Sequence, residues 1–324
     1  MQSVLATGGA GTLLLSRSDV ERLLTPDACI AAVEDAFRRL ALGETSPPGI
    51  LGMHAGAGSF HVKAARLGGV FAAKLNANFP GNPARGLPTI QGVVVLSDAQ
   101  DGRLLALMDS MAITALRTAA ASAVAAKYLS RKDSQTLLIC GCGAQAPAQL
   151  DAMLSVRQPK RILAYDQDAK KASALKGATP VSDLAKAVAE SDIIITCTTA
   201  RRYFVTRDMV RPGTFIAAVG ADHEEKQEIE PQLMAHAKVV TDLTEQAAAI
   251  GDLHHAIEAG EMSRDGVHAQ LGEVLAGKKP GRMSDGEIII FDSTGTGLQD
   301  VAAAIAVFQR ALASGEGARF SFNG

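Results

Sequence analysis

The stretch 136–146, Thr-Leu-Leu-Ile-Cys-Gly-Cys-Gly-Ala-Gln-Ala, decides the fold. Its first half, Thr136–Cys140, is an apolar run of strand length, and its second half is a Gly-x-Gly-x-x-Ala loop that opens a helical stretch. Such a turn between a buried strand and a helix is typical of dinucleotide-binding folds, because the helix N-terminus attracts phosphate. A lone motif of this kind is weak evidence for dinucleotide binding, so the residues around it must be considered as well.

Each of the small residues in the loop is explained by a physical requirement of the site. Gly141 permits the tight turn, Gly143 lets the backbone approach a pyrophosphate, and Ala146 allows the helix to pack closely on the strand. Asp166 follows the next predicted strand, where a carboxylate accepts hydrogen bonds from ribose hydroxyls and repels a 2′-phosphate. A plain glycine-rich loop and a turn-forming aspartate would explain each part alone. The combination predicts an NAD(H) site, and NADP(H) stays open.

Further apolar runs alternate with helical stretches through the rest of the chain. The predicted strands are Arg161–Tyr165, Asp192–Cys197, Thr214–Val219, Lys238–Val240 and Ile288–Phe291. Strands buried on both faces and separated by helices predict an α/β fold with a Rossmann-type, doubly wound parallel sheet. Loops that follow such strands face the ligand, so Thr198 and Val219 are predicted cofactor neighbours.

The first part of the chain has a different pattern. A helix with one apolar face is predicted over 28–42, and short runs punctuated by Pro and Gly from Ser46 to Gly92 predict an antiparallel sheet. This pattern indicates an α+β domain. The expected divisions are 1–124 for that domain, 125–301 for the NAD-binding Rossmann domain, and 302–324 for a C-terminal helix that packs back on the first domain.

Composition excludes several classes of protein. The chain has 324 residues, of which 47% are hydrophobic and 20% charged, and its net charge of −2 shows no basic excess for nucleic acid or an anionic membrane. No apolar run approaches the roughly 20 residues of a bilayer span, and the first residues lack a secretory pattern. The four cysteines show no CxxC pair. We expect a cytoplasmic enzyme without nucleic-acid or membrane partners.

Three basic residues of the first part lie in apolar or glycine-rich surroundings. Lys74 is embedded in 70–76, Arg117 precedes an alanine run, and Lys63 lies on a predicted strand whose same face carries His61. A buried cation without an anionic partner costs on the order of several kcal/mol. A substrate carboxylate would supply that partner, and a structural ion pair or a snorkelling lysine would explain each residue equally well. Together they indicate a site for a small anion.

Metal binding and cysteine chemistry are not predicted. His254 and His255 have no third ligand at a suitable spacing, and the chain has no HExxH motif. Cys140 and Cys142 lie in the strand and the glycine loop, where they are typical packing residues.

An ordered set of motifs resembles a known family. The set is Lys74-Leu75-Asn76, Pro80–Pro83, Gly86–Thr89, Ile113–Ala120, Gly141–Gln145, Ala218–Asp222 and Phe291–Gly295. In this order the motifs resemble the ornithine cyclodeaminase/mu-crystallin family over nearly the whole chain, and the set is far more specific than any single motif. The resemblance implies a homodimer built through the first domain, a Rossmann domain, and a substrate held at the interdomain cleft beside the nicotinamide.

The resemblance also implies roles for individual residues. Lys74 and Arg117 match the family's substrate-carboxylate binders, and Asp222 matches the acidic residue that handles the substrate nitrogen and its proton. Asp222 and Lys74 are therefore the predicted catalytic residues. The cofactor positions are matched by Thr118, Ala144, Gln145 and Asp166.

Two positions depart from the family's pattern. The usual first-domain arginine is replaced by Gly49, and the glutamate of true ornithine cyclodeaminases falls on His61. Without that glutamate the second ammonium of ornithine would lose its acidic partner, which argues against cyclodeamination. Lys63, on the same predicted face, would replace the arginine, and His61 would line the pocket. The segment Phe60–Ala65 looks like the Δ1-pyrroline-2-carboxylate (ketimine) reductase branch of the family.

The resulting prediction is NAD(P)H-dependent reduction of a cyclic imino acid, Δ1-pyrroline-2-carboxylate to L-proline, and by extension Δ1-piperideine-2-carboxylate to L-pipecolate. Arg117, Lys74 and Lys63 would orient the carboxylate. Asp222 would hydrogen-bond the protonated nitrogen. Three alternatives stay open: an ornithine cyclodeaminase that forms proline and ammonia, an amino-acid dehydrogenase such as alanine dehydrogenase, and a non-catalytic mu-crystallin-like binding protein.

Overall fold

The computed structural model describes residues 11–322, which divide into two compact units. Over this range the first unit runs to Arg117 and resumes at Thr296, and the second covers Thr118–Gly295. The expected boundaries were 124/125 and 301/302. The substrate-binding and dimerisation role of the first unit stays a prediction. Within the described range no helix is both long and apolar enough to cross a membrane.

The first unit contains a seven-stranded sheet in the order β17-β1-β6-β5-β4-β3-β2. Its strands are β1 (Thr12–Leu15), β2 (Gly49–Ala55), β3 (Gly58–Leu67), β4 (Val70–Asn78), β5 (Ile90–Asp98), β6 (Leu104–Asp109) and β17 (Ala318–Phe320). Strands β2 to β6 form an antiparallel meander, as the Pro/Gly pattern predicts. Its helices are α2 (Arg17–Leu23), α3 (Pro26–Ala41) and α12 (Gly297–Ser314), together with the start of α4 (Ser110–Leu129).

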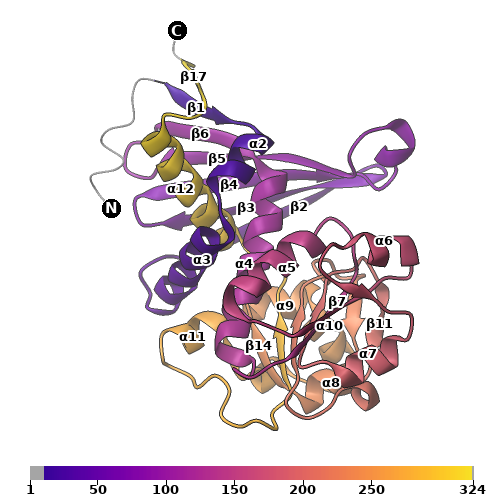
Figure 1. Ribbon diagram of the computed structural model, residues 1–324. Helices are drawn as coiled ribbons and strands as arrows, with labels where there is room; N and C mark the ends of the chain where they lie inside the picture. Colours follow the sequence, from indigo (N-terminus) through magenta and orange to yellow (C-terminus); the bar gives the residue numbers. More distant parts are fainter. Residues whose placement is uncertain (1–10, 323–324) are drawn as a thin grey trace. The chain divides into compact units, whose positions relative to one another are not determined.

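Helix α12 covers one face of this sheet, packing on β3, β4, β5 and α3 (Figure 1). Its first residue, Gly297, lies against the backbone of Ala64, where a Cβ atom would come within 2.8 Å of the carbonyl carbon and oxygen. That separation is shorter than real Cβ contacts, so glycine lets the helix approach the strand this closely. The approach brings the polar residues of the first turn of α12 under the sheet.

The opposite face of β2, β3 and β4 is apolar and exposed. Register places Leu51 level with Val62 and Leu75, and Met53 level with Phe60, so these side chains share that face. We define the apolar sheet face as Leu51, Met53, Phe60, Phe71 and Leu75, each of which is exposed. A contiguous apolar patch of this kind is a mark of a protein–protein contact.

The second unit is built on an eight-stranded sheet in the order β15-β14-β16-β12-β10-β7-β8-β9, and its strands pair in parallel. Its strands are β7 (Thr136–Cys140), β8 (Arg161–Tyr165), β9 (Thr179–Pro180), β10 (Ile193–Thr196), β12 (Phe215–Ala218), β14 (Lys238–Thr241), β15 (Ala269–Gln270) and β16 (Ile289–Asp292). Its helices are the rest of α4, α5 (Ala146–Val156), α6 (Ala169–Ala174), α7 (Leu184–Glu190), α8 (Pro231–His236), α9 (Thr244–Ile250), α10 (Asp252–Glu258) and α11 (Leu271–Leu275). A small two-stranded sheet, β11 (Arg201–Val205) with β13 (Gln227–Ile229), was not predicted.

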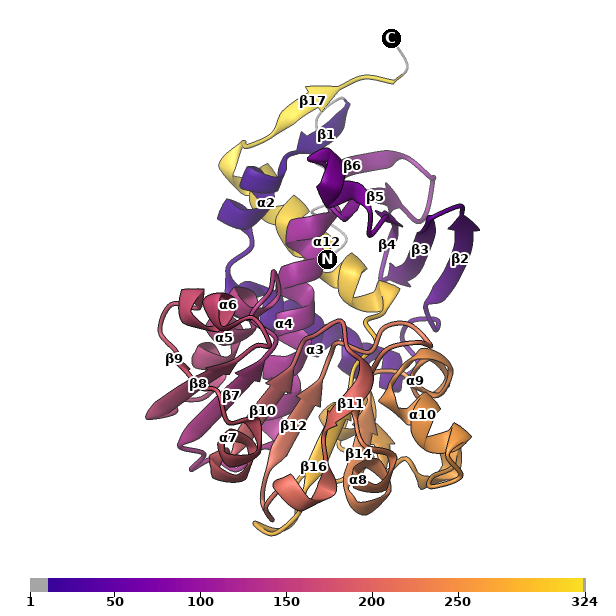
Figure 2. The same ribbon diagram turned by 90° about the vertical axis from the view of Figure 1, so that its right-hand side faces the viewer.

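The strand order identifies where a ligand would bind. From β7 the chain proceeds outward to β8 and β9, and then crosses to β10 on the other side of β7 (Figure 2). The carboxyl ends of β7 and β10 therefore flank the switch point at which doubly wound sheets hold ligands. The predicted fold class, a Rossmann-type parallel sheet plus an α+β unit, is confirmed.

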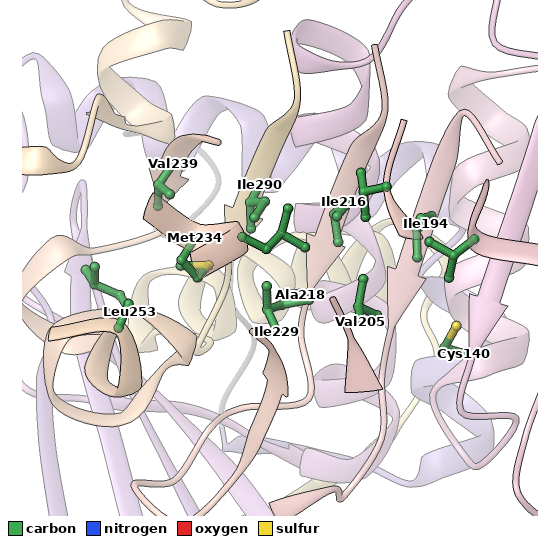
Figure 3. Packing of buried hydrophobic residues seen from close by; sticks show 14 of the residues in the cluster. Cys140, Ile194, Val205, Ile216, Ala218, Ile229, Met234, Val239, Leu253 and Ile290 are labelled. Atoms are coloured by element: carbon green, nitrogen blue, oxygen red, sulfur yellow. The ribbon is translucent and has the colours of Figure 1, made fainter. Parts of the chain in front are cut away.

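Fully buried strands form the core of the second unit. Ile194, Ile216 and Ile290 lie on three neighbouring strands and pack with Val205 and Leu253 (Figure 3). Burial on both faces explains why these strands are uninterrupted apolar runs in the sequence.

Candidate active site

Two lysines lie side by side on the face of the first sheet that α12 covers. Lys63 of β3 is directly opposite Lys74 of β4, and His61 is opposite Asn76. Directly opposite residues share a face, as the spacing of His61 and Lys63 predicts, and like charges in such a pair repel. Negative charge is therefore needed near Lys63 and Lys74.

Asp300 of α12 supplies part of that charge. Its Oδ1 lies 2.9 Å from the Nζ of Lys74 and 3.0 Å from the Nε of Arg117. Lys74 also donates to Thr114 Oγ1 at 3.2 Å, and Arg117 Nη1 donates to Gln299 Oε1 at 2.6 Å. The cations singled out from the sequence thus meet a carboxylate of the chain itself. We call Lys63, Lys74, Arg117 and Asp300 the cationic cluster.

Burial controls the electrostatics of this cluster. Lys74 is 3% exposed and Asp300 is 1% exposed. Burial lowers the pKa of Lys74 to about 7, against the attraction of Asp300 and with the repulsion of Arg117 and Lys63. Burial alone would raise the pKa of Asp300, but Lys74 and Arg117 outweigh it and hold that pKa below its usual range. Three basic groups around one ionised carboxylate favour a second anion below about pH 7.

Gln299 offers a donor for such an anion. Its Oε1 accepts from Arg117, while its Nε2 is buried and has no hydrogen-bond partner among residues 11–322. A buried donor without a partner costs about 1–3 kcal/mol. A ligand carboxylate beside Arg117 would satisfy it.

His61 lies on the same sheet face, half-buried, with its Nε2 at 2.9 Å from Ser59 Oγ. The imidazole therefore has a hydroxyl neighbour, and its assignment to the position of the cyclodeaminase glutamate stays a prediction. His61 therefore contributes no carboxylate to this face of the sheet.

The glycine loop of the second unit has the shape of a phosphate site. Gly141 has φ +94°, and a Cβ there would lie 2.7 Å from Thr198 Cγ2, so only glycine fits. A Cβ at Gly143 would meet nothing within 4 Å in the described part of the chain. Helix α5 then begins at Ala146 without a side-chain cap from Gln145, whose Oε1 is also buried without a described partner. Uncapped N–H groups beside open space fit a pyrophosphate.

Asp166 is held at this loop, as the sequence predicts. It directly follows β8, and its Oδ2 accepts a hydrogen bond from the Cys142 N–H at 2.7 Å. Its Oδ1 accepts from the Asp168 N–H at 2.9 Å. Each oxygen keeps a lone pair, so the carboxylate is oriented and still able to accept from ribose hydroxyls.

The loops after β10 and β12 meet on one buried carboxylate, Glu228, which was not singled out from the sequence. Oε1 accepts from the N–H and the Oγ1 of Thr198, both at 2.7 Å, and Oε2 accepts from Thr196 Oγ1 at 2.7 Å and the Gly220 N–H at 2.8 Å. Burial raises the pKa of Glu228, and the donors of Thr198 and Thr196 oppose that rise.

The remaining predicted residues belong to the second unit. Val219 follows β12, is nearly buried, and donates its N–H to Thr196 at 2.9 Å. Asp222 follows two residues after Gly220, and its Oδ1 lies 2.5 Å from Lys226 Nζ. Thr118 is a nearly buried residue of α4, and Ala144 is exposed in the glycine loop.

The structure thus forms two groups of predicted residues. His61, Lys63, Lys74 and Arg117 come together in the first unit. The cofactor residues and Asp222 belong to the second unit. Over 11–322, no three His, Cys, Asp or Glu side chains are arranged to hold a metal ion. Burial raises the pKa of the Cys142 thiol to about 11, which leaves it protonated and unreactive at neutral pH.

Removing the charge of Asp300 tests the cationic cluster. Asp300→Asn keeps the shape but leaves two buried cations facing an amide, so we expect the free energy of unfolding to fall by about 3 kcal/mol in urea titrations. The deficit should shrink as pH rises through 7, because Lys74 then loses its proton. The control is Asp101→Asn, an exposed partner of Arg103, with an expected change below about 0.5 kcal/mol. Equal effects of the two variants would contradict this description.

Comparison with known proteins identifies the family. The profile of the ornithine cyclodeaminase/mu-crystallin family matches residues 11–315. An archaeal alanine dehydrogenase dimer with bound NAD is 39% identical with a TM-score of 0.93, covering 96% of this chain and 99% of that one. The Δ1-pyrroline-2-carboxylate reductase of Thermococcus litoralis, in complex with NADH and L-proline, is 34% identical with a TM-score of 0.90, covering 95% and 100%.

A third solved structure is the iminosuccinate reductase of Paracoccus denitrificans in complex with NAD+. It is 33% identical with a TM-score of 0.87, and the match covers 94% of this chain and 98% of that one. These relatives are named as dehydrogenases and reductases, and the resemblance drawn from the motifs is confirmed. The chain belongs to the ornithine cyclodeaminase/mu-crystallin family.

Proposed function

We propose that this chain is an NAD-dependent oxidoreductase that reduces an imino acid. The observation that carries the proposal is the cationic cluster, in which Lys63, Lys74 and Arg117 surround one carboxylate and Gln299 presents an unpaired donor. Such a group favours a carboxylate ligand. The similar proteins of known structure are named for reactions on amino and imino acids, which supports the same class of substrate.

The preferred substrate is Δ1-pyrroline-2-carboxylate. A second ammonium, as in ornithine, would be repelled by the cationic cluster and would find His61 where a cyclodeaminase has an acid. A cyclic imine carries its nitrogen within the ring and brings no second ammonium. The second candidate is alanine dehydrogenase activity, favoured by the 39% identity to the archaeal enzyme.

The residues of the second unit fit a dinucleotide. Gly141, Gly143 and Ala144 with the start of α5 would hold the pyrophosphate, and Asp166 would accept from the ribose. Bound NADH would supply the hydride. Gln145, Thr118, Thr198 and Val219 complete the proposed cofactor positions.

The chain's own residues orient the substrate and control its proton. Arg117 and Lys74, with Lys63, would fix the carboxylate, and positioning of this kind accounts for a large part of many enzymatic rate enhancements. The Asp222 carboxylate would accept a hydrogen bond from the protonated imine nitrogen. It thereby favours the iminium, which is the better electrophile. The protein thus mainly positions and polarises the substrate.

The activity assay follows NADH absorbance with freshly prepared Δ1-pyrroline-2-carboxylate. We expect stoichiometric NADH loss and L-proline formation, at lower rates with the six-membered imine and with pyruvate plus ammonia. The matched variant is Arg117→Ala, which should lose activity by orders of magnitude while still binding NADH. A faster reaction with pyruvate and ammonia would favour alanine dehydrogenase. Ammonia release from ornithine without net NADH change would contradict the reductase, and NADH binding without any turnover would indicate a binding protein.

Asp166 is expected to set the cofactor preference. Because its carboxylate would repel a 2′-phosphate, wild-type kcat/KM should be at least tenfold higher with NADH than with NADPH. Asp166→Ser should narrow this ratio. The control is Asp168→Ser, which removes a neighbouring carboxylate while serine can still cap α6, and which should leave the ratio unchanged. Equal efficiency of both cofactors in the wild type would refute the role.

We also propose that the apolar sheet face joins two copies of the chain. The exposed apolar sheet face supports self-association, and a relative of known structure is a dimer. Met53→Glu, at a side chain 62% exposed in that face, should convert a dimer to a monomer in sedimentation velocity experiments. Met283→Glu, 66% exposed in the second unit, is the control and should stay dimeric. A monomeric wild type would disprove the proposal.

A further inference from the structure

We infer that Glu228 is a positioning residue that holds the Thr198 loop and the Gly220–Asp222 loop in their working arrangement. The inference rests on the proposed function, since these loops carry residues assigned there to the cofactor and to the imine nitrogen. Glu228 itself is fully buried and is not among the residues assigned there to the cofactor or the substrate.

All four contacts of the carboxylate come from donors on these two loops or on the strand before one of them. Two of the donors are backbone N–H groups, of Thr198 and Gly220, and they bind different oxygens of Glu228. A backbone N–H only donates, so both oxygens must act as acceptors. The residue that fits here is therefore an acid, and an amide of the same shape does not fit.

The fit around Glu228 is close. A Cβ on Gly220 would lie 2.4 Å from Glu228 Oε1 and 2.5 Å from the carbonyl oxygen of Thr198. Thr198 in turn lies against Gly141 of the dinucleotide loop, where a Cβ would be 2.7 Å from its Cγ2. The contacts therefore run without a break from the loop of β7 through Thr198 and Glu228 to the Asp222 loop.

One further buried carboxylate, Asp252, binds the backbone of Glu228, and a second, Asp292, binds the start of the helix that carries Asp252. Asp252 Oδ1 accepts from the N–H groups of Glu228 and Ile229 at 2.8 and 2.9 Å. Asp292, at the end of β16, accepts from the N–H of Leu253 at 2.8 Å. The side chain of Glu228 thus projects from a braced backbone, and a shift of its carboxylate would move both loops.

The test compares Glu228→Gln with Asp192→Asn. Either orientation of the new amide points its NH2 at a backbone N–H, of Thr198 or of Gly220, so one loop must move. The control is Asp192, another buried carboxylate, which lies before β10 rather than after it. Its Oδ2 accepts the N–H groups of Gln135 and Thr136, and its Oδ1 pairs with Arg131 and Arg211. We expect Glu228→Gln to speed hydrogen–deuterium exchange in 197–200 and 219–223. It should also weaken NADH binding and lower kcat for the imine at least tenfold.

Asp192→Asn should lower the melting temperature while leaving exchange in both loops, the NADH Kd and kcat within about twofold of wild type. Wild-type exchange and kinetics in Glu228→Gln would overturn the inference, as would the same loop changes in Asp192→Asn. If Glu228→Gln fails to fold, Thr196→Val removes one donor from the carboxylate and should produce a smaller change in the same two loops; unchanged loops would overturn the inference. The exchange measurement needs no substrate. It therefore tests whether Glu228 holds the two loops in place even if the protein does not catalyse the proposed reaction.

Discussion

The shared ion pair of Lys74 and Arg117 with Asp300 is the constraint on which the first unit depends. Two cations lie in the interior of this unit, where an unpaired charge costs on the order of several kcal/mol. Their carboxylate comes from α12, which follows both cations by more than 180 residues, so the chain must return to the first sheet after completing the second unit. Gly297 lets α12 approach the strands closely enough for Asp300 to reach both cations.

The same cluster gives the proposed function its specificity. Lys74 and Arg117 share one carboxylate, and Lys63 lies level with Lys74, so the basic groups of the cationic cluster outnumber its carboxylates. A ligand carboxylate would complete the balance, whereas a second ammonium would worsen it. The second unit contributes an acid of a different kind, Glu228, which acts on loops rather than on a ligand.

Much of the second unit could be predicted from the sequence, because its strands are buried on both faces. The strands Thr136–Cys140 and Arg161–Tyr165 have the bounds expected of them. The cations of the first unit were also found, since charge among apolar residues is a local signal. Their partner was not, although Asp300 stands out equally in the apolar helix 298–304. Glu228 gave no signal, because it lies in the charged segment 222–230, which is typical of an exposed loop.

A crystal structure of the chain with NADH and L-proline would test whether the cationic cluster binds the substrate carboxylate. We predict a carboxylate oxygen of proline about 3 Å from Lys74 Nζ or the guanidinium of Arg117, with Gln299 Nε2 donating to the same group. Proline bound elsewhere, with Asp300 still the only carboxylate in contact with Lys74 and Arg117, would contradict this role of the cluster.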